Sequence, residues 1–143
     1  MKRVIVTVIV GFCLSHSGYA QSSGLAEQFD IYAKYENFTY VYMGEGYSEL
    51  KVPENITKEF FSVKFVKILS GTKKHTKQAK GDCLEMVRAI LNGEEFELIL
   101  KMQESGRKTE IYLKKTGKKD LEKVIISDNG KEVSVTWIYG KAK

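Results

Sequence analysis

Apolar and polar side chains alternate with a period of two in the last third of the chain, in four successive runs. The runs cover residues 96–103, 109–114, 124–126 and 133–137, and the third of them, Val124-Ile125-Ile126, is wholly apolar. Turn-forming stretches separate them, and the last of these, Asp128-Asn129-Gly130, supplies the positive φ that a tight turn requires. Because successive residues of a strand point to opposite faces of a sheet, this pattern predicts an antiparallel meander of four strands with one buried face.

Two segments upstream of the meander carry apolar residues at helical spacing. These residues are Leu25, Phe29 and Tyr32 in the first segment, and Leu84, Val87 and Leu91 in the second. The first segment predicts a helix over residues 24–35. In the second, Asp82 and Glu85 resemble a capping box at the start of a helix, and Asn92-Gly93 ends it.

Two further strand-like runs, residues 39–43 and 63–69, lie between these helices and are joined by a loop that contains Pro53. The predicted order is helix, strand, loop, strand and helix, followed by the four strands of the meander. We therefore expect an α+β fold. Its antiparallel sheet would consist of the C-terminal four-strand meander plus one or two N-terminal strands, with two helices packed on one face.

The first twenty residues have the pattern of a signal peptide. Lys2 and Arg3 form a basic start, an apolar run covers residues 4–14, and Gly18-Tyr19-Ala20 offers small residues for cleavage. The apolar run is about half of the roughly 20 residues that cross a bilayer. We therefore expect cleavage before Gln21, and no transmembrane segment in the mature form.

A lipid on Cys13 is another possible means of membrane attachment. However, Phe12 stands before it, where the lipoprotein peptidase requires a small side chain. We expect residues 21–143 to form a single α+β domain that is periplasmic or secreted and carries no lipid anchor. Cleavage would leave Cys83 as the only cysteine, so an intramolecular disulfide is not expected.

Few residues after the predicted signal peptide are suited to catalysis or metal binding. His75 and Cys83 are the only histidine and cysteine there, and a reactive pair needs their side chains about 3 Å apart with a third group to orient the imidazole. Cys83 falls on the apolar side of a predicted helix, so we interpret it as an inert thiol and His75 as a solvated side chain. We expect no catalytic residue, no metal and no cofactor.

Positive charge is concentrated in two stretches of this chain, whose net charge is +5. The lysines are Lys73, Lys74, Lys77 and Lys80 before the second helix, and Lys114, Lys115, Lys118 and Lys119 at the turn inside the meander. Both groups are candidate contacts for an anionic surface or a polysaccharide. The alternative is that they keep the protein soluble and prevent pairing between sheet edges. The overall charge is too weakly basic for a nucleic-acid binder, and export also argues against such a partner.

Aromatic residues are dense in and around the first predicted strand, and Tyr40, Tyr42 and Tyr47 are candidates for a binding surface. Tyr40 and Tyr42 share one face of the strand, so Val41 and Met43 take the other face. An exposed tyrosine row suits a carbohydrate or a partner protein. The alternative places these rings under the first helix, with their hydroxyl groups reaching water.

The order of these elements is similar to that of a known bacterial family. A leader and a short helix precede the strand Phe38-Thr39-Tyr40-Val41-Tyr42-Met43 and the run Phe65-Val66-Lys67-Ile68-Leu69-Ser70, and the meander closes on Trp137-Ile138-Tyr139-Gly140. In this order and spacing the chain resembles the bacterial domain-of-unknown-function 4252 family. Members of that family are small exported or lipid-anchored envelope proteins without an established activity. The resemblance therefore implies an envelope location and an α+β fold, and it supplies no catalytic residues.

These observations favour an exported, non-enzymatic binding module of the bacterial envelope. We expect its partner to be another envelope or extracellular protein. Two alternatives stay open. One is an exported hydrolase-type enzyme whose catalytic residues the sequence does not identify, and the other is a polyanion-binding protein that uses the lysine clusters.

Overall fold

The computed structural model describes residues 23–36, 38–71 and 77–143, so the predicted signal peptide lies outside the described residues. Helices and strands follow one another along the described chain. They are α2 (Ser23–Ala33), β1 (Phe38–Gly44), α3 (Glu45–Lys51), α4 (Glu54–Thr57), β2 (Phe60–Gly71), α5 (Lys77–Gly93), β3 (Glu97–Glu104), β4 (Arg107–Lys115), β5 (Asp120–Asp128) and β6 (Val133–Ala142).

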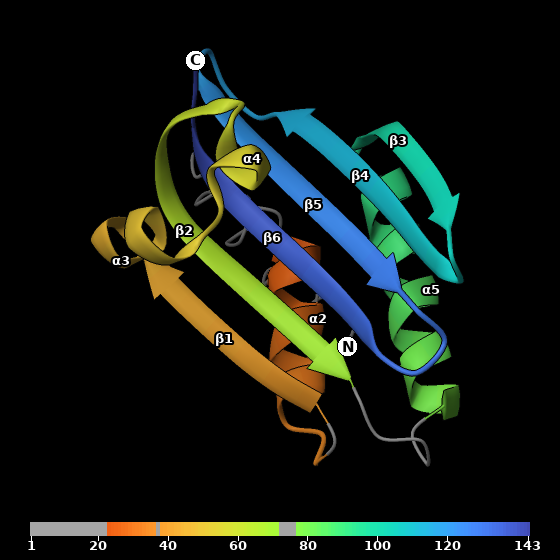
Figure 1. The fold of residues 1–143 in the computed structure, drawn as a ribbon. Helices are drawn as coiled ribbons and strands as arrows, with labels where there is room; N and C mark the ends of the chain where they lie inside the picture. The colour runs from red at the N-terminus through yellow and green to blue at the C-terminus, as the bar shows by residue number, and fades with distance from the viewer. Residues whose placement is uncertain (1–22, 37, 72–76) are drawn as a thin grey trace, which may run out of the picture.

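The strands form one open, six-stranded antiparallel sheet in the order β1-β2-β6-β5-β4-β3 (Figure 1). The predicted α+β class and antiparallel sheet are confirmed. Strands β3 to β6 make the predicted meander, and both upstream strands join it because β2 pairs with the last strand, β6.

The described residues form four helices, two more than the sequence pattern predicts. α2 and α5 are the predicted ones, and both lie behind the sheet as drawn in Figure 1. α3 and α4 occupy the segment that was predicted to be a loop, and Pro53 directly precedes α4. α4 lies in front of the sheet, so the helices are not restricted to one face. α5 begins at Lys77, well before Asp82, so the predicted capping box is wrong and Asp82 lies inside the helix.

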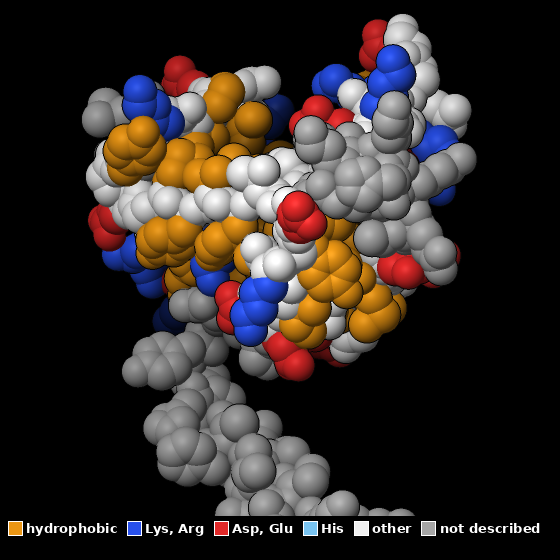
Figure 2. Space-filling model, turned by 90° about the horizontal axis from the view of Figure 1, so that it is seen from below, with side chains coloured by type: hydrophobic (Ala, Val, Ile, Leu, Met, Phe, Trp, Pro, Cys, Tyr) orange, Lys and Arg blue, Asp and Glu red, His pale blue; other side chains and the backbone are white. Residues whose placement is uncertain are grey.

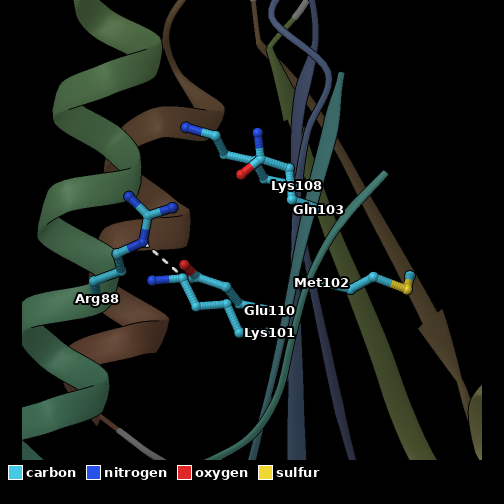
Figure 3. Close-up of a pocket in the computed structure, with 6 residues that line it drawn as sticks. All are labelled: Arg88, Lys101, Met102, Gln103, Lys108 and Glu110. Atoms are coloured by element: carbon cyan, nitrogen blue, oxygen red, sulfur yellow. Dashed lines mark hydrogen bonds and ion pairs between the residues drawn. The ribbon is translucent and has the colours of Figure 1, made fainter. Parts of the chain in front are cut away.

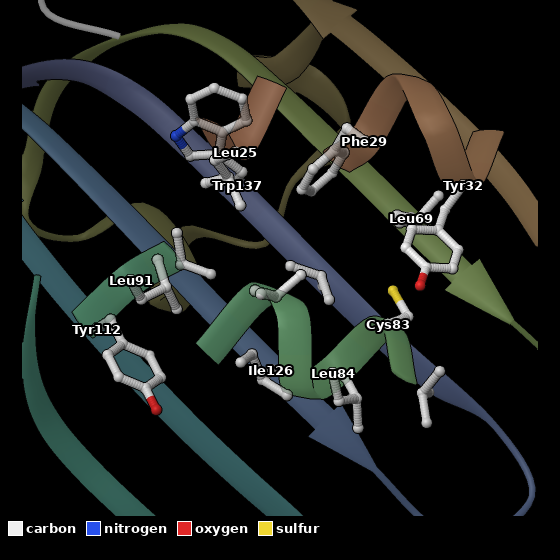
Figure 4. Close-up of a cluster of buried hydrophobic side chains, with 14 of the residues drawn as sticks. Leu25, Phe29, Tyr32, Leu69, Cys83, Leu84, Leu91, Tyr112, Ile126 and Trp137 are labelled. Atoms are coloured by element: carbon white, nitrogen blue, oxygen red, sulfur yellow. The ribbon is translucent and has the colours of Figure 1, made fainter. Parts of the chain in front are cut away.

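The sheet face toward α2 and α5, called here the helical face, carries the larger core (Figure 4). Trp137 of β6 is fully buried, and its ring centroid lies 5.7 Å from that of Phe29 in α2. The six apolar positions that predicted the two helices are all buried, so this part of the prediction is confirmed. They are Leu25, Phe29, Tyr32, Leu84, Val87 and Leu91. Each such side chain contributes roughly 1.5–3 kcal/mol to the free energy of unfolding through removal from water.

The opposite face of the sheet, called here the open face, buries a second, smaller cluster beside α4. This cluster joins Met43, Val66 and Ile138 of three neighbouring strands to Ile56 of α4. Four consecutive residues of β5, from Leu121 to Val124, are buried, so this strand has side chains covered on both faces. The prediction of a meander with one buried face is therefore wrong for β5.

The first strand of the meander also differs from the prediction, because all eight residues of β3 are exposed. A register shift between Leu98 and Leu100 places Leu98 opposite Tyr112 and Leu100 opposite Ile111. A β-bulge of this kind adds one residue to a strand and changes the face to which the following side chains point. The expected apolar row of β3 is therefore divided between the two faces.

Candidate functional site

A cleft at the end of the sheet beside the C-terminus gathers five lysines, and we call it the lysine cleft. It has a volume of about 460 Å³. Its lining residues are Lys115, Lys118, Lys119, Asp120, Lys141, Lys143, Phe61 and Ala142. The turn between β4 and β5 and the end of β6 lie next to each other at the top of Figure 1 and bring these residues together.

Backbone hydrogen bonds hold the two sides of the lysine cleft in place. The amide of Ala142 donates to the carbonyl oxygen of Lys119 at 2.6 Å, which ties the end of β6 to the β4–β5 turn. The amide of Thr116 closes the turn by donating to the carbonyl oxygen of Asp120 at 3.1 Å. The amide of Lys143 donates to the carbonyl oxygen of Glu59 at 3.1 Å, so the chain just before β2 also positions the C-terminal lysine.

The charge of the lysine cleft is strongly positive. Asp120 is the one side-chain carboxylate among the lining residues, and its Oδ1 lies 2.6 Å from Nζ of Lys141. This hydrogen bond raises the pKa of Lys141 above its usual value. Lys115, Lys118, Lys119 and Lys143 are exposed side chains. An anion that enters the cleft would therefore meet several cations held near one another by the fold.

An aromatic ring lies beside these lysines. Phe61, at the start of β2, is 80% exposed, more than any other large hydrophobic side chain that the structure describes. Its neighbour Phe60 is buried, because alternate residues of the strand point in opposite directions. An exposed aromatic ring at the edge of a basic cleft suits a partner that presents both negative charge and an apolar group.

The structure separates the predicted lysine clusters. Lys115, Lys118 and Lys119 line the cleft, but Lys114 does not, because it points to the helical face, where its Nζ lies 5.5 Å from the centroid of the Phe96 ring. Lys73 and Lys74, with His75, lie outside the described residues, and so does the side chain of Lys77. The placement of Lys80 in an exposed loop is wrong, because it lies in α5 with only 5% exposed and its Nζ donates to the carbonyl oxygen of Lys131.

Lys141, Lys143 and Phe61 belong to the cleft and were not predicted from the sequence. They lie far from the β4–β5 turn along the chain. The register of β5 with β6, in which Asp120 pairs with Lys141, brings the two lysines to it, and the pairing of Phe60 with Ala142 brings Phe61.

The predicted tyrosine row is also divided. Tyr40 is half-buried, packs against the core of the helical face, and has its ring centroid 6.2 Å from that of Phe29. Burial accordingly raises the pKa of Tyr40. Tyr42 and Tyr47 are each 56% exposed. Figure 2 shows hydrophobic side chains gathered on the left of the molecule, the side on which Figure 1 places β1 and α3, with charged side chains around them.

Serine substitutions are expected to distinguish the two strand tyrosines. Tyr40→Ser should lower the free energy of unfolding by about 2 kcal/mol, because it removes a ring that packs under α2. Tyr42→Ser should change it by less than about 1 kcal/mol, because that ring is mostly in water. Urea denaturation measures both values. Equal losses for the two variants would contradict this assignment of core and surface.

The arrangement around Cys83 is unfavourable for nucleophilic chemistry. The residue is 1% exposed, and burial raises the pKa of its thiol to about 12, so thiolate is scarce at neutral pH.

Among the described residues, no group of three or more His, Cys, Asp or Glu side chains is placed to hold a metal ion. The described part of the chain contains no helix of the length and apolar character needed to cross a membrane.

The fold and this site define an α+β protein with an open antiparallel sheet and a basic cleft at one end. Comparison with known proteins found no matching family model, no matching curated protein and no matching solved structure. Membership of the domain-of-unknown-function 4252 family stays a prediction that depends on the order and spacing of the strands.

Proposed function

We propose that this chain is an exported, non-enzymatic binding module of the bacterial envelope, periplasmic or secreted, and that it binds an acidic segment of another envelope protein in the lysine cleft. The observation that supports this proposal is the convergence of five lysines and the exposed Phe61 on one cleft. The lysines supply long-range attraction for carboxylates, and the ring supplies apolar contact area at the point of docking.

A polysaccharide with many negative charges is the second candidate, because the lysines of the cleft outnumber its single side-chain carboxylate. Such a partner depends mainly on charge, whereas an acidic protein segment also uses Phe61. The two candidates therefore differ in their sensitivity to Phe61→Ser and in the steepness with which salt weakens binding.

Removal of three cleft charges is expected to release the partner. In the triple variant Lys115→Gln, Lys118→Gln and Lys119→Gln, we expect affinity to fall about 100-fold, from on the order of 1 kcal/mol for each lysine facing an anionic surface. The measurement is cross-linking in native cells, followed by mass spectrometry of what purifies with the tagged protein and titration of the recovered partner.

The matched control is Lys101→Gln of β3 with Lys108→Gln of β4, which removes charge from exposed residues near the β3–β4 turn, at the end of the hairpin away from the lysine cleft, and should leave partner recovery unchanged. Loss of the partner in Phe61→Ser supports an acidic protein segment. Retention in Phe61→Ser, together with elution from heparin that depends steeply on salt, supports the polysaccharide. Unchanged recovery in the triple variant would refute both.

A further inference from the structure

A second pocket lies between α5 and the hairpin formed by β3 and β4, and we call it the hairpin pocket. It has a volume of about 540 Å³, within the range of small-molecule sites. Arg88 of α5 lies on one side, and Lys101 and Gln103 of β3 and Lys108 and Glu110 of β4 lie on the other (Figure 3). Met102 also belongs to the lining, but its side chain points away from the other five.

Strand pairing explains why these polar groups gather on the helical face. Lys101 is opposite Glu110, and Gln103 is opposite Lys108, so all four residues point to the same side of the hairpin. Closer to the core this side of β4 carries the buried Tyr112, but toward the tip of the hairpin it carries polar and charged residues. The polar groups therefore lie just where the covering helix leaves the sheet accessible.

Glu110 forms a fixed floor for the pocket. The residue is 8% exposed, and one of its oxygens, Oε1, accepts hydrogen bonds from Nε of Arg88 at 2.9 Å and from the hydroxyl of Tyr112 at 3.0 Å. The bond from Nε uses one of the five N–H groups of the guanidinium. In Figure 3 the two terminal nitrogens of Arg88 point away from Glu110, to the side on which Lys108 and Gln103 lie. Arg88 is thereby oriented with donors toward the open part of the pocket.

The charges of the pocket do not balance, because three cations share it with one carboxylate. A bound anion would reduce the repulsion among Arg88, Lys101 and Lys108. The planar guanidinium binds oxyanions through two parallel hydrogen bonds, the lysines add point charges, and Gln103 offers amide donors.

We propose that the hairpin pocket binds a small, compact oxyanion that carries two or more negative charges, such as a phosphate or a polycarboxylate. Arg88 and Gln103 orient the anion, Lys101 and Lys108 supply most of the attraction, and Glu110 holds Arg88 in position. The site is separate from the lysine cleft, since Lys108 and Lys115 are seven positions apart on one strand, or about 23 Å.

Binding of inorganic phosphate and of citrate to the whole protein tests this proposal, at constant ionic strength maintained with sodium chloride. We expect saturable stabilisation against thermal unfolding with at least one of the two anions. The double variant Lys101→Gln with Lys108→Gln should raise the apparent Kd about tenfold or more. Both lysines are exposed, so the variant is expected to fold, and its melting temperature without anion verifies this.

The matched control removes the same charge from two exposed lysines that line neither basic site, as Lys34→Gln with Lys51→Gln, and should leave the Kd unchanged. Saturation by phosphate alone would assign the pocket to a phosphoryl group, and saturation by both anions to any compact polyanion. No saturable binding of either anion, or an equal rise in Kd for the two double variants, would overturn the proposal.

Discussion

Replacing Gly140 with alanine is expected to lower the free energy of unfolding by about 3 kcal/mol or more. A Cβ atom at this position would overlap the carbonyl oxygen of Ser62 and lie 2.9 Å from Cα of Val63, in the neighbouring strand β2. Both are backbone atoms, so no side-chain rotation relieves the contact. The strands would have to separate at the point where the register of β2 against β6 shifts, between Val63 and Phe65.

A glycine in open space provides the control for this substitution. Gly81 lies in α5, and no atom approaches within 4 Å of the position of its Cβ. Gly81→Ala should therefore stabilise the protein by up to about 1 kcal/mol through helix propensity. Urea denaturation followed by the fluorescence of Trp137 measures both variants. A loss below about 1 kcal/mol in Gly140→Ala would mean that the two strands can move apart without difficulty.

The elements that could be predicted are those with a local pattern. Alternation of period two predicted the strands of the meander, and three- and four-residue spacing predicted α2 and α5, because burial of one face imposes these periods on the sequence. Residues 39–43 and 63–69 were predicted as strands from their apolar and aromatic character. The register shift between Leu98 and Leu100 was not predictable in this way, because a bulge leaves the apolar residues in place and changes only the face to which they point. The two short helices around Pro53 have too few residues to show a period.

The candidate site shows the same division between local and long-range information. Lys115, Lys118 and Lys119 are close in sequence, so their clustering at a turn could be predicted from the sequence alone. The exclusion of Lys114 had a usable signal, since adjacent strand residues point to opposite faces. The addition of Lys141 had none within its own segment, because it depends on the pairing of Asp120 with Lys141 across two strands. In the hairpin pocket, Arg88 and Glu110 meet only through the packing of a helix on a sheet.

Replacing Lys123 with methionine is expected to lower the free energy of unfolding by about 2–3 kcal/mol. Lys123 is 3% exposed on the open face, and its Nζ donates to the carbonyl oxygen of Ile56 and to Oε1 of Glu59, each at 2.8 Å. Methionine fills a similar volume but leaves both acceptors without this donor. The expected loss is at the low end for a buried pair, because the Glu59 side chain is 26% exposed and water can reach it.

A double-mutant cycle separates the ion pair from the packing of the lysine stem. Lys123→Met combined with Glu59→Leu should recover most of the stability lost in Lys123→Met, because the unpaired carboxylate is then also absent. The control is Lys64→Met, whose partner Glu45 lies 3.5 Å away on the surface. This variant should lower the free energy of unfolding by less than about 1 kcal/mol.

The carbonyl oxygen of Glu59 also accepts a hydrogen bond from the amide of Lys143, so Lys123→Met should loosen the C-terminal side of the lysine cleft. Faster amide hydrogen exchange at Lys143 in Lys123→Met, but not in Lys64→Met, would show that the buried lysine helps to position the cleft, whereas equal exchange rates would limit its role to stability.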